Sequence, residues 1–110
     1  PATISVNPGT AEPTETRIVV LARGAGEPIT AQDTVGANIA RTTWDNSVFE
    51  STWDIGAPSR ITVSAAPNLT GLVGVPVGSR VVMVQAAGTD ANGTAVPARA
   101  YVIDIDAKLR

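Results

Sequence analysis

Alternation of hydrophobic and polar positions is the clearest pattern in this chain of 110 residues. It predicts strands, because successive side chains of a strand point to opposite faces of a sheet. Val35, Ala37 and Ile39 are spaced in this way, as are Ile61 and Val63. With runs rich in β-branched residues added, five strands are expected: Arg17–Arg23, Thr34–Thr43, Arg60–Ser64, Arg80–Gln85 and Ala100–Asp106.

A single segment has helical spacing. Leu69, Leu72 and Val73 stand at positions i, i+3 and i+4, which share one face of a helix. Two glycines in the segment weaken that helix by roughly 1 kcal/mol each relative to alanine. The sequence therefore predicts one short helix near Asn68–Val73 that depends on packing. Many strands and one short helix favour an α+β fold, with a mostly antiparallel sheet and the helix on one face.

A hairpin is expected in the middle of the chain. Asp45 and Asn46 supply turn chemistry after Thr34–Thr43, because their side chains bond to nearby backbone and tolerate tight turns. A second strand with Val48, Phe49 and Trp53 would follow, and a loop from residue 54 to residue 58. Phe49 is the only phenylalanine of the chain, so it is expected either in the core or in the wall of a pocket.

Composition narrows the chemistry. The chain has no Cys and no His, so thiolate metal sites, thiol nucleophiles and a histidine general base are excluded. The net charge is −2 and no basic patch is visible, so nucleic acid is not an expected partner. No apolar run approaches the ~20 residues that span a bilayer, so this domain is not expected to contact a membrane. Residues 1–16, rich in Pro, Thr and Glu, are interpreted as an arm or edge strand, and residues 17–110 as the domain.

The segment from Asp33 to Asp54 reads D-T-V-x-x-N-x-x-x-T-x-W-D-N-S-V-F-E-S-T-W-D. It resembles the signature of the FKBP-type peptidyl-prolyl cis-trans isomerases, in which a strand with G-D-T-V and N-Y-T-G runs into D-G and V-F-D-S-S. Val77-Gly-Ser-Arg80 is similar to that family's V-G-x-R turn, and the last strand is similar to its L-V-F-D-V-E-L. The resemblance covers about Arg17 to Leu109. It implies an antiparallel sheet curled around one short helix.

The resemblance also implies a proline-binding pocket. Phe49 matches a pocket phenylalanine, and Glu50 stands where the family has aspartate. Aromatic residues of the family are replaced elsewhere: Ile39 stands for a tyrosine, Ser59 for a phenylalanine, Asn68 or Leu69 for a tryptophan, and Ile103 for a phenylalanine. We expect Phe49, Glu50 and Ile39 to act in catalysis. Substrate is expected to contact Leu69, Ile103, Tyr101 and Val96.

The implied activity is isomerisation of X–Pro bonds in proline-containing peptides or unfolded protein segments. Rotation about such a bond crosses a barrier of ~18–20 kcal/mol, and lowering it requires contacts that are better in the twisted state than in the planar one. No cofactor or metal is needed. Because most of the family's pocket aromatics are replaced, the expected activity is weak.

Two alternatives remain open. The first is an FKBP-like peptide-binding or structural module that has lost catalysis, with a possible sister domain in the parent chain. The second is a β-sandwich adhesion module, which would lack the helix near Asn68. Glu50 also has a simpler interpretation, as a solvated hairpin residue. An extracytoplasmic place in a bacterial envelope, or secretion, is expected.

Overall fold

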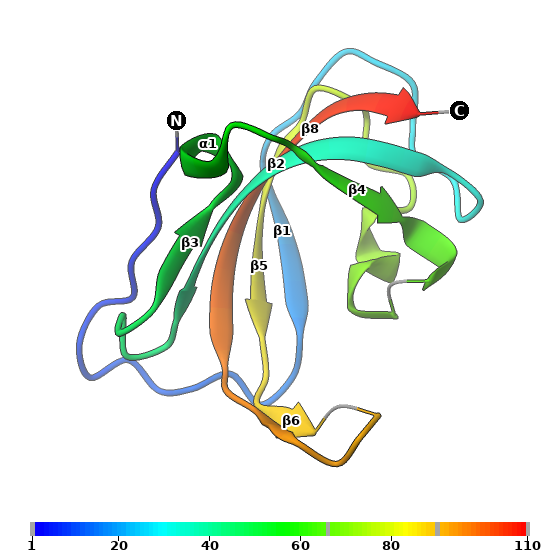
Figure 1. Ribbon diagram of the computed structural model, residues 1–110. Helices are drawn as coiled ribbons and strands as arrows, with labels where there is room; N and C mark the ends of the chain where they lie inside the picture. Colours follow the sequence, from blue (N-terminus) through cyan, green and yellow to red (C-terminus); the bar gives the residue numbers. More distant parts are fainter. Residues whose placement is uncertain (1, 66, 90, 110) are drawn as a thin grey trace.

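The longest pairing in the computed structural model joins β2 (Thr34–Thr43) to β8 (Arg99–Leu109), antiparallel and in the middle of the main sheet (Figure 1). The structure describes residues 2–65, 67–89 and 91–109, without the side chains of residues 67 and 68. The sheet order is β1-β5-β8-β2-β3, and β4 also pairs with β2. The remaining strands of this sheet are β1 (Arg17–Ala22), β3 (Phe49–Ser51), β4 (Ser59–Thr62) and β5 (Arg80–Gln85).

All five predicted strands are present, and the α+β prediction is confirmed. β2 and β5 have the predicted bounds, whereas β8 continues to Leu109. The register of β2 against β8 shifts between Gly36 and Ala37. Beyond this shift, β8 continues to pair with β2 although its hydrophobic alternation has ended. β4 ends at Thr62 because the chain turns there into the 3-10 helix η1 (Val63–Ala65). A small ribbon of β6 (Gly88–Thr89) and β7 (Ala95–Val96) lies in the segment that was not expected to contain strands.

The helical segments differ from the expectation. The predicted helix is η2 (Pro67–Leu72), a 3-10 helix that ends before Val73. Its Gly71 lies close to β1: an added Cβ would be 3.1 Å from Cδ1 of Ile18, a contact that a small shift of that side chain would relieve. Within the described residues the α-helical turn is α1 (Thr52–Ile55), where a strand residue and a loop were expected. None of the described helices is long and apolar enough to cross a membrane.

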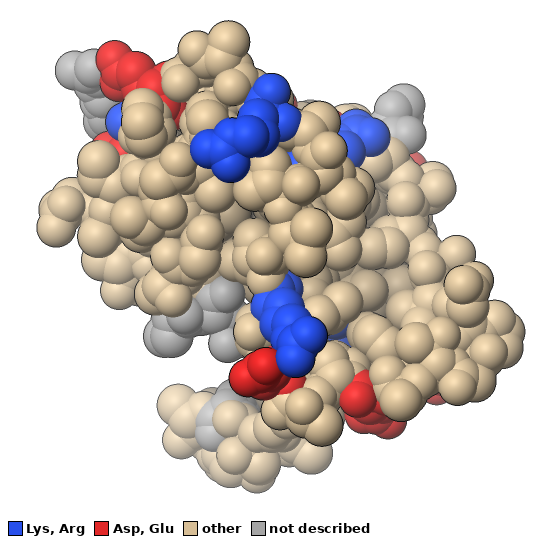
Figure 2. Space-filling model, turned by 180° about the vertical axis from the view of Figure 1, so that it is seen from behind, with Lys and Arg blue, Asp and Glu red and all other residues tan. Residues whose placement is uncertain are grey.

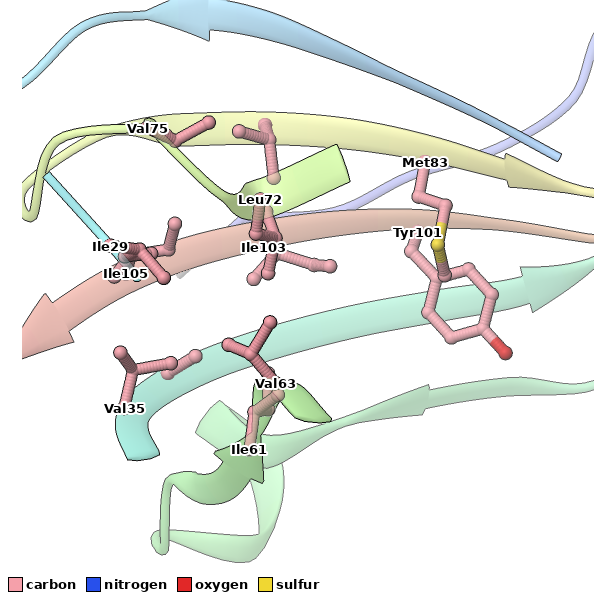
Figure 3. Packing of buried hydrophobic residues seen from close by; sticks show 12 residues of the cluster. Ile29, Val35, Ile61, Val63, Leu72, Val75, Met83, Tyr101, Ile103 and Ile105 are labelled. Atoms are coloured by element: carbon pink, nitrogen blue, oxygen red, sulfur yellow. The ribbon is translucent and has the colours of Figure 1, made fainter. Parts of the chain in front are cut away.

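The hydrophobic core lies on one face of the main sheet, between the strands and the two 3-10 helices. Leu72 from η2 is fully buried against it, and Ile29 joins it from the long connection between β1 and β2. Figure 3 shows Met83 and Tyr101, which are cross-strand partners, at one end of this cluster. The buried cluster comprises Ile29, Val35, Ala37, Ile61, Val63, Leu72, Val75, Val81, Met83, Tyr101, Ile103 and Ile105.

Residues 2–16 form no helix or strand and run past the hairpin before β1 begins (Figure 1). The side chain of Asn46 fixes this arm by two bonds to Val6: its Oδ1 accepts from the backbone N–H at 2.8 Å, and its Nδ2 donates to the carbonyl at 2.7 Å. The indole of Trp44 donates to the carbonyl of Thr10 at 2.9 Å. The turn of the hairpin thus holds the arm.

β1 is an edge of the sheet and pairs only with β5 among the described strands. Its outward side chains Val19 and Leu21 are 56% and 60% exposed, whereas Ile18 and Val20 pack on the core. The face of the molecule seen in Figure 2 is mostly uncharged, and its charged side chains lie apart in small groups.

Gly24 lies close to the V-G-x-R turn at Val77–Arg80, and this close approach can be tested. A Cβ on Gly24 would overlap the carbonyl of Val77 and the backbone of Gly78. We expect Gly24→Ala to lower the free energy of unfolding by about 1–3 kcal/mol, since backbone cannot move aside cheaply. Gly88→Ala is the matched control, because nothing lies within 4 Å of its Cβ position. Equal urea midpoints for the two variants would contradict the close approach.

Candidate functional site

A hollow of about 250 Å³ opens at the Tyr101 end of the core. It lies where β2, β3, α1, β4 and β8 meet, so residues far apart in the sequence form its wall. Apolar groups come from Ile39, Ile55 and the ring of Tyr101. The full lining is Ile39, Arg41, Glu50, Ser51, Thr52, Ile55, Ser59 and Tyr101.

The hollow exists because the partner strand of β2 is interrupted. β3 pairs with residues 40–42 of β2, and β4 pairs with residues 34–37. Between the two, the chain leaves β2 as α1 and returns at Ser59. The gap leaves the backbone of β2 near Ile39 without a strand on that side, and the departing chain forms a rim.

A chain of hydrogen bonds fills the gap. The backbone N–H of Ile39 donates to Oγ1 of Thr52 at 2.8 Å, and that hydroxyl donates to Oδ1 of Asn38 at 2.9 Å. Nδ2 of Asn38 then donates to Oδ2 of Asp106 on β8 at 2.8 Å. Thr52 therefore replaces the missing strand partner and holds α1 at the edge of the hollow.

The turn α1 is capped at both ends. Oγ of Ser51 accepts from the N–H of Trp53 at 3.2 Å, which satisfies a free donor of the first turn. Gly56 ends the turn in the left-handed region with φ 80°, where glycine avoids the steric cost of a side chain. The capped turn presents Ile55, 74% exposed, at the mouth of the hollow.

Arg41 belongs to the polar side of the hollow, together with Glu50. It lies opposite Glu50 on β3 and opposite Tyr101 on β8. Its Nε and Nη2 donate to Oε1 of Glu50 at 3.1 and 2.8 Å. Partial burial acts to lower the pKa of Arg41, but Glu50 and Tyr101 raise it more, so the net shift is upward and the guanidinium stays charged. The Tyr101 hydroxyl donates to Oε1 of Gln85 at 2.7 Å.

Several of the residues expected at the pocket lie together in the hollow. Ile39, Glu50 and Tyr101 all line it, as does Ser59, the residue that stands where the family has a phenylalanine. They come from four strands and meet because β2 pairs with β3, β4 and β8.

Phe49 does not line the hollow, contrary to the expectation. It lies opposite Thr42 in the β2–β3 ladder, whereas Glu50 lies opposite Arg41. Since neighbouring side chains of a strand point to opposite faces, Phe49 projects from the other side of the sheet. It is 42% exposed, so the core interpretation of Phe49 is also wrong.

Three other expected pocket residues lie elsewhere. Ile103 is 1% exposed and belongs to the core, and Leu69 packs against the same cluster from η2. Val96 lies in the β6–β7 ribbon. None of the three lines the hollow. The side chain of Asn68, the alternative to Leu69, lies outside the described part of the chain.

Sequence reasoning missed Arg41, Ser51, Thr52 and Ile55. A signal for α1 was available: Ser51 followed three residues later by Asp54, with Gly56 after the turn, is a start and stop pattern of a short helix. Arg41 would have followed from counting the register back from the hairpin turn, which sets it opposite Glu50.

Two further hollows, of about 360 and 330 Å³, lie beside the arm and share Glu12, Trp44 and Asp45. Bonds from the side chain and backbone of Ser47 and from Thr43 lower the pKa of Asp45 to about 2. These bonds belong to the turn, and neither hollow contains a residue from the expected site. In the part of the chain that is described, no group of three or more acidic side chains could hold a metal ion.

Comparison with solved structures identifies the fold. The N-terminal domain of FKBP42 from Arabidopsis thaliana is similar with a TM-score of 0.68 and 12% identity, over 96% of this chain and 99% of that one. FkpA from Escherichia coli gives a TM-score of 0.70 and 19% identity, over 93% of this chain and 52% of that one. A peptidyl-prolyl cis-trans isomerase from Pseudomonas syringae gives 0.65 and 18%, over 94% and 84%.

The protein therefore has an FKBP-type fold, as the sequence resemblance predicted. No protein-family model matches the chain, and no curated protein matches it by sequence.

The role of Thr52 can be tested by removing its hydroxyl. Thr52→Val leaves the N–H of Ile39 and Oδ1 of Asn38 without their partner, so we expect a loss of about 1–3 kcal/mol in unfolding free energy. Amide exchange at Ile39 should become faster. Thr52→Ser keeps the hydroxyl and should lose less than about 1 kcal/mol. Equal losses for valine and serine would show that packing of the methyl group dominates.

The placement of Phe49 can be tested against that of Ile103. Phe49→Ala should cost about 1 kcal/mol or less in chemical denaturation, as expected for a partly exposed position. Ile103→Ala should cost about 2–5 kcal/mol, because it leaves a cavity in the core. A cost for Phe49→Ala as large as that for Ile103→Ala would mean that the ring packs inside the domain.

Proposed function

We propose that this domain binds X–Pro segments of extended or unfolded protein chains in the hollow at Ile39, Glu50, Ser59 and Tyr101, and isomerises them weakly. The observation that carries the proposal is the position of the hollow. Three of its residues, Ile39, Glu50 and Ser59, are those that the resemblance matches to pocket positions of the isomerase family. The FKBP-type fold supports the same assignment.

Isomerisation of an X–Pro bond requires few chemical groups in the wall of the hollow. Rotation about the imide bond needs no nucleophile and no proton carrier. It needs a slot that holds proline, excludes water and is more complementary to the twisted amide than to the planar one. Ile39, Ile55 and the ring of Tyr101 offer apolar surface for a proline ring, and the polar groups of Arg41 and Glu50 lie beside it.

Weak activity follows from the missing rings. Tyr101 is the only aromatic residue among those that line the hollow in the described chain. Each loss of ~1.4 kcal/mol in transition-state contact lowers the rate tenfold. Two or three such losses would place the activity on the order of a hundred- to a thousandfold below that of a domain with a full aromatic set.

A gain-of-function variant tests the proposal. Ser59→Phe restores a ring where the resemblance places one, and we expect it to raise kcat/KM about tenfold, the equivalent of ~1.4 kcal/mol of transition-state contact. The measurement is NMR exchange or a protease-coupled assay on short X–Pro peptides. Phe49→Ala, on the other face of the sheet, is the control and should leave the rate unchanged.

The possible results separate the two roles of the hollow. Peptide binding without any gain in rate would indicate a binding module without catalysis. Absence of both binding and activity in the wild type and in Ser59→Phe would contradict the proposed function. Loss of activity in Phe49→Ala would place the site on the opposite face.

A further inference from the structure

We propose that Arg41 binds the ligand, by donating hydrogen bonds to a backbone carbonyl of the peptide next to the X–Pro bond, while Glu50 holds the guanidinium in place. This inference rests on the proposed function, because it concerns the same hollow. It adds a contact that the family resemblance does not supply, since Arg41 is not among the residues matched to the family's pocket.

The argument begins with the donors in the wall. The hydroxyl protons of Thr52 and Tyr101 are already used, toward Asn38 and Gln85. Ile39 and Ile55 have no polar side-chain atoms. The tyrosine that would donate in the family is replaced by Ile39. Ser51 and Ser59 have only neutral hydroxyl groups, so the charged donor that lines the hollow is Arg41.

Arg41 has unused capacity. A guanidinium has five N–H donors in a fixed plane. Nε and one N–H of Nη2 are directed to a single oxygen, Oε1 of Glu50. A side-chain hydrogen bond to Tyr101 also contributes to the raised pKa of Arg41. Within the described residues, Glu50 and Tyr101 therefore engage three of the five N–H groups, and two remain for a ligand. Hydrogen bonds from a charged donor are about twice as strong as those between neutral groups.

Glu50 keeps the guanidinium at the wall. Both of its bonds use one carboxylate oxygen, so the pair fixes the plane of Arg41 and leaves part of the guanidinium available. The pair lies at the surface of the hollow, with 38% of the Arg41 side chain and 54% of the Glu50 side chain accessible to solvent. The Arg41–Glu50 pair therefore forms a polar edge beside the apolar surface of Ile39, Ile55 and Tyr101. A ligand with a peptide group next to a proline ring would present a polar and an apolar part in the same arrangement.

The identity of the acceptor follows from the reaction. The oxygen of the rotating imide is more negative in the planar state, because resonance moves charge onto it. A donor on that oxygen would stabilise the planar ground state and slow the rotation. The productive acceptor is therefore the carbonyl of a neighbouring peptide unit, which does not change during rotation. Such a contact is equal in the ground and transition states, so it lowers KM and leaves kcat unchanged.

The test compares three variants on one short Ala-X-Pro peptide. Arg41→Met keeps the length of the side chain and removes the donors, and we expect KM to rise about tenfold with kcat within about twofold. Arg41→Lys should recover part of the loss. Glu50→Gln keeps an acceptor for Arg41 and should change KM less than about threefold. Denaturation midpoints of all variants serve as the check on folding.

Each outcome decides the inference. If the ion pair were only structural, Arg41→Met and Glu50→Gln would have the same effect, and this would overturn it. A fall in kcat at constant KM would also overturn it, because Arg41 would then act on the rotating bond. If the wild type is inactive, the dissociation constants of the same peptide, from NMR titration, replace KM. Binding that is equal in wild type and Arg41→Met contradicts the inference, whereas no binding by the wild type contradicts the proposed function itself.

Discussion

The pairing of β2 with β8 is the constraint on which the rest of the structure depends. The ladder runs from Thr34 opposite Leu109 to Thr43 opposite Arg99. It brings together side chains as distant as Asn38 and Asp106, which are 68 residues apart in the chain. On one side β8 receives β5 and then β1, and on the other β2 receives β3 and β4. The core face and the hollow both consist of side chains that this pairing aligns.

The site results from a defect in that regular arrangement. A continuous strand beside β2 would cover the backbone near Ile39, and no hollow would form. The excursion through α1 opens the space. Oγ1 of Thr52 accepts from the backbone N–H of Ile39 and so replaces the hydrogen bond that a strand partner would have made there. The hollow is polar along one side as a result, since the hairpin register also aligns Arg41 with Glu50 there. A wall of this kind relies on directed hydrogen bonds more than on enclosure by aromatic rings.

The strands could be predicted because alternation records which face of a sheet is buried, as in Val35, Ala37 and Ile39. The helix was less predictable, since the spacing of Leu69 and Leu72 fits a 3-10 turn that meets the same core as well as it fits an α-helix. The site depends on register, which alternation alone does not give. Phe49 and Glu50 are neighbours in the sequence, yet they lie on opposite faces, and only the pairing with Thr42 and Arg41 tells which of them enters the hollow.

The exposed edge at β1 has a consequence for the behaviour of the protein in solution. Val19 and Leu21 place apolar surface beside backbone groups that have no second strand partner among the described strands, a combination that favours sheet extension between molecules. Arg17 and Arg23 flank this segment in the sequence. Antiparallel association of two such edges would set Arg17 of one copy near Arg23 of the other. Glu15 pairs with Arg17 at 2.9 Å and reduces the repulsion between these like charges. Salt screens the charges that remain at these ends, so the balance at this edge between apolar contact and charge repulsion shifts with ionic strength.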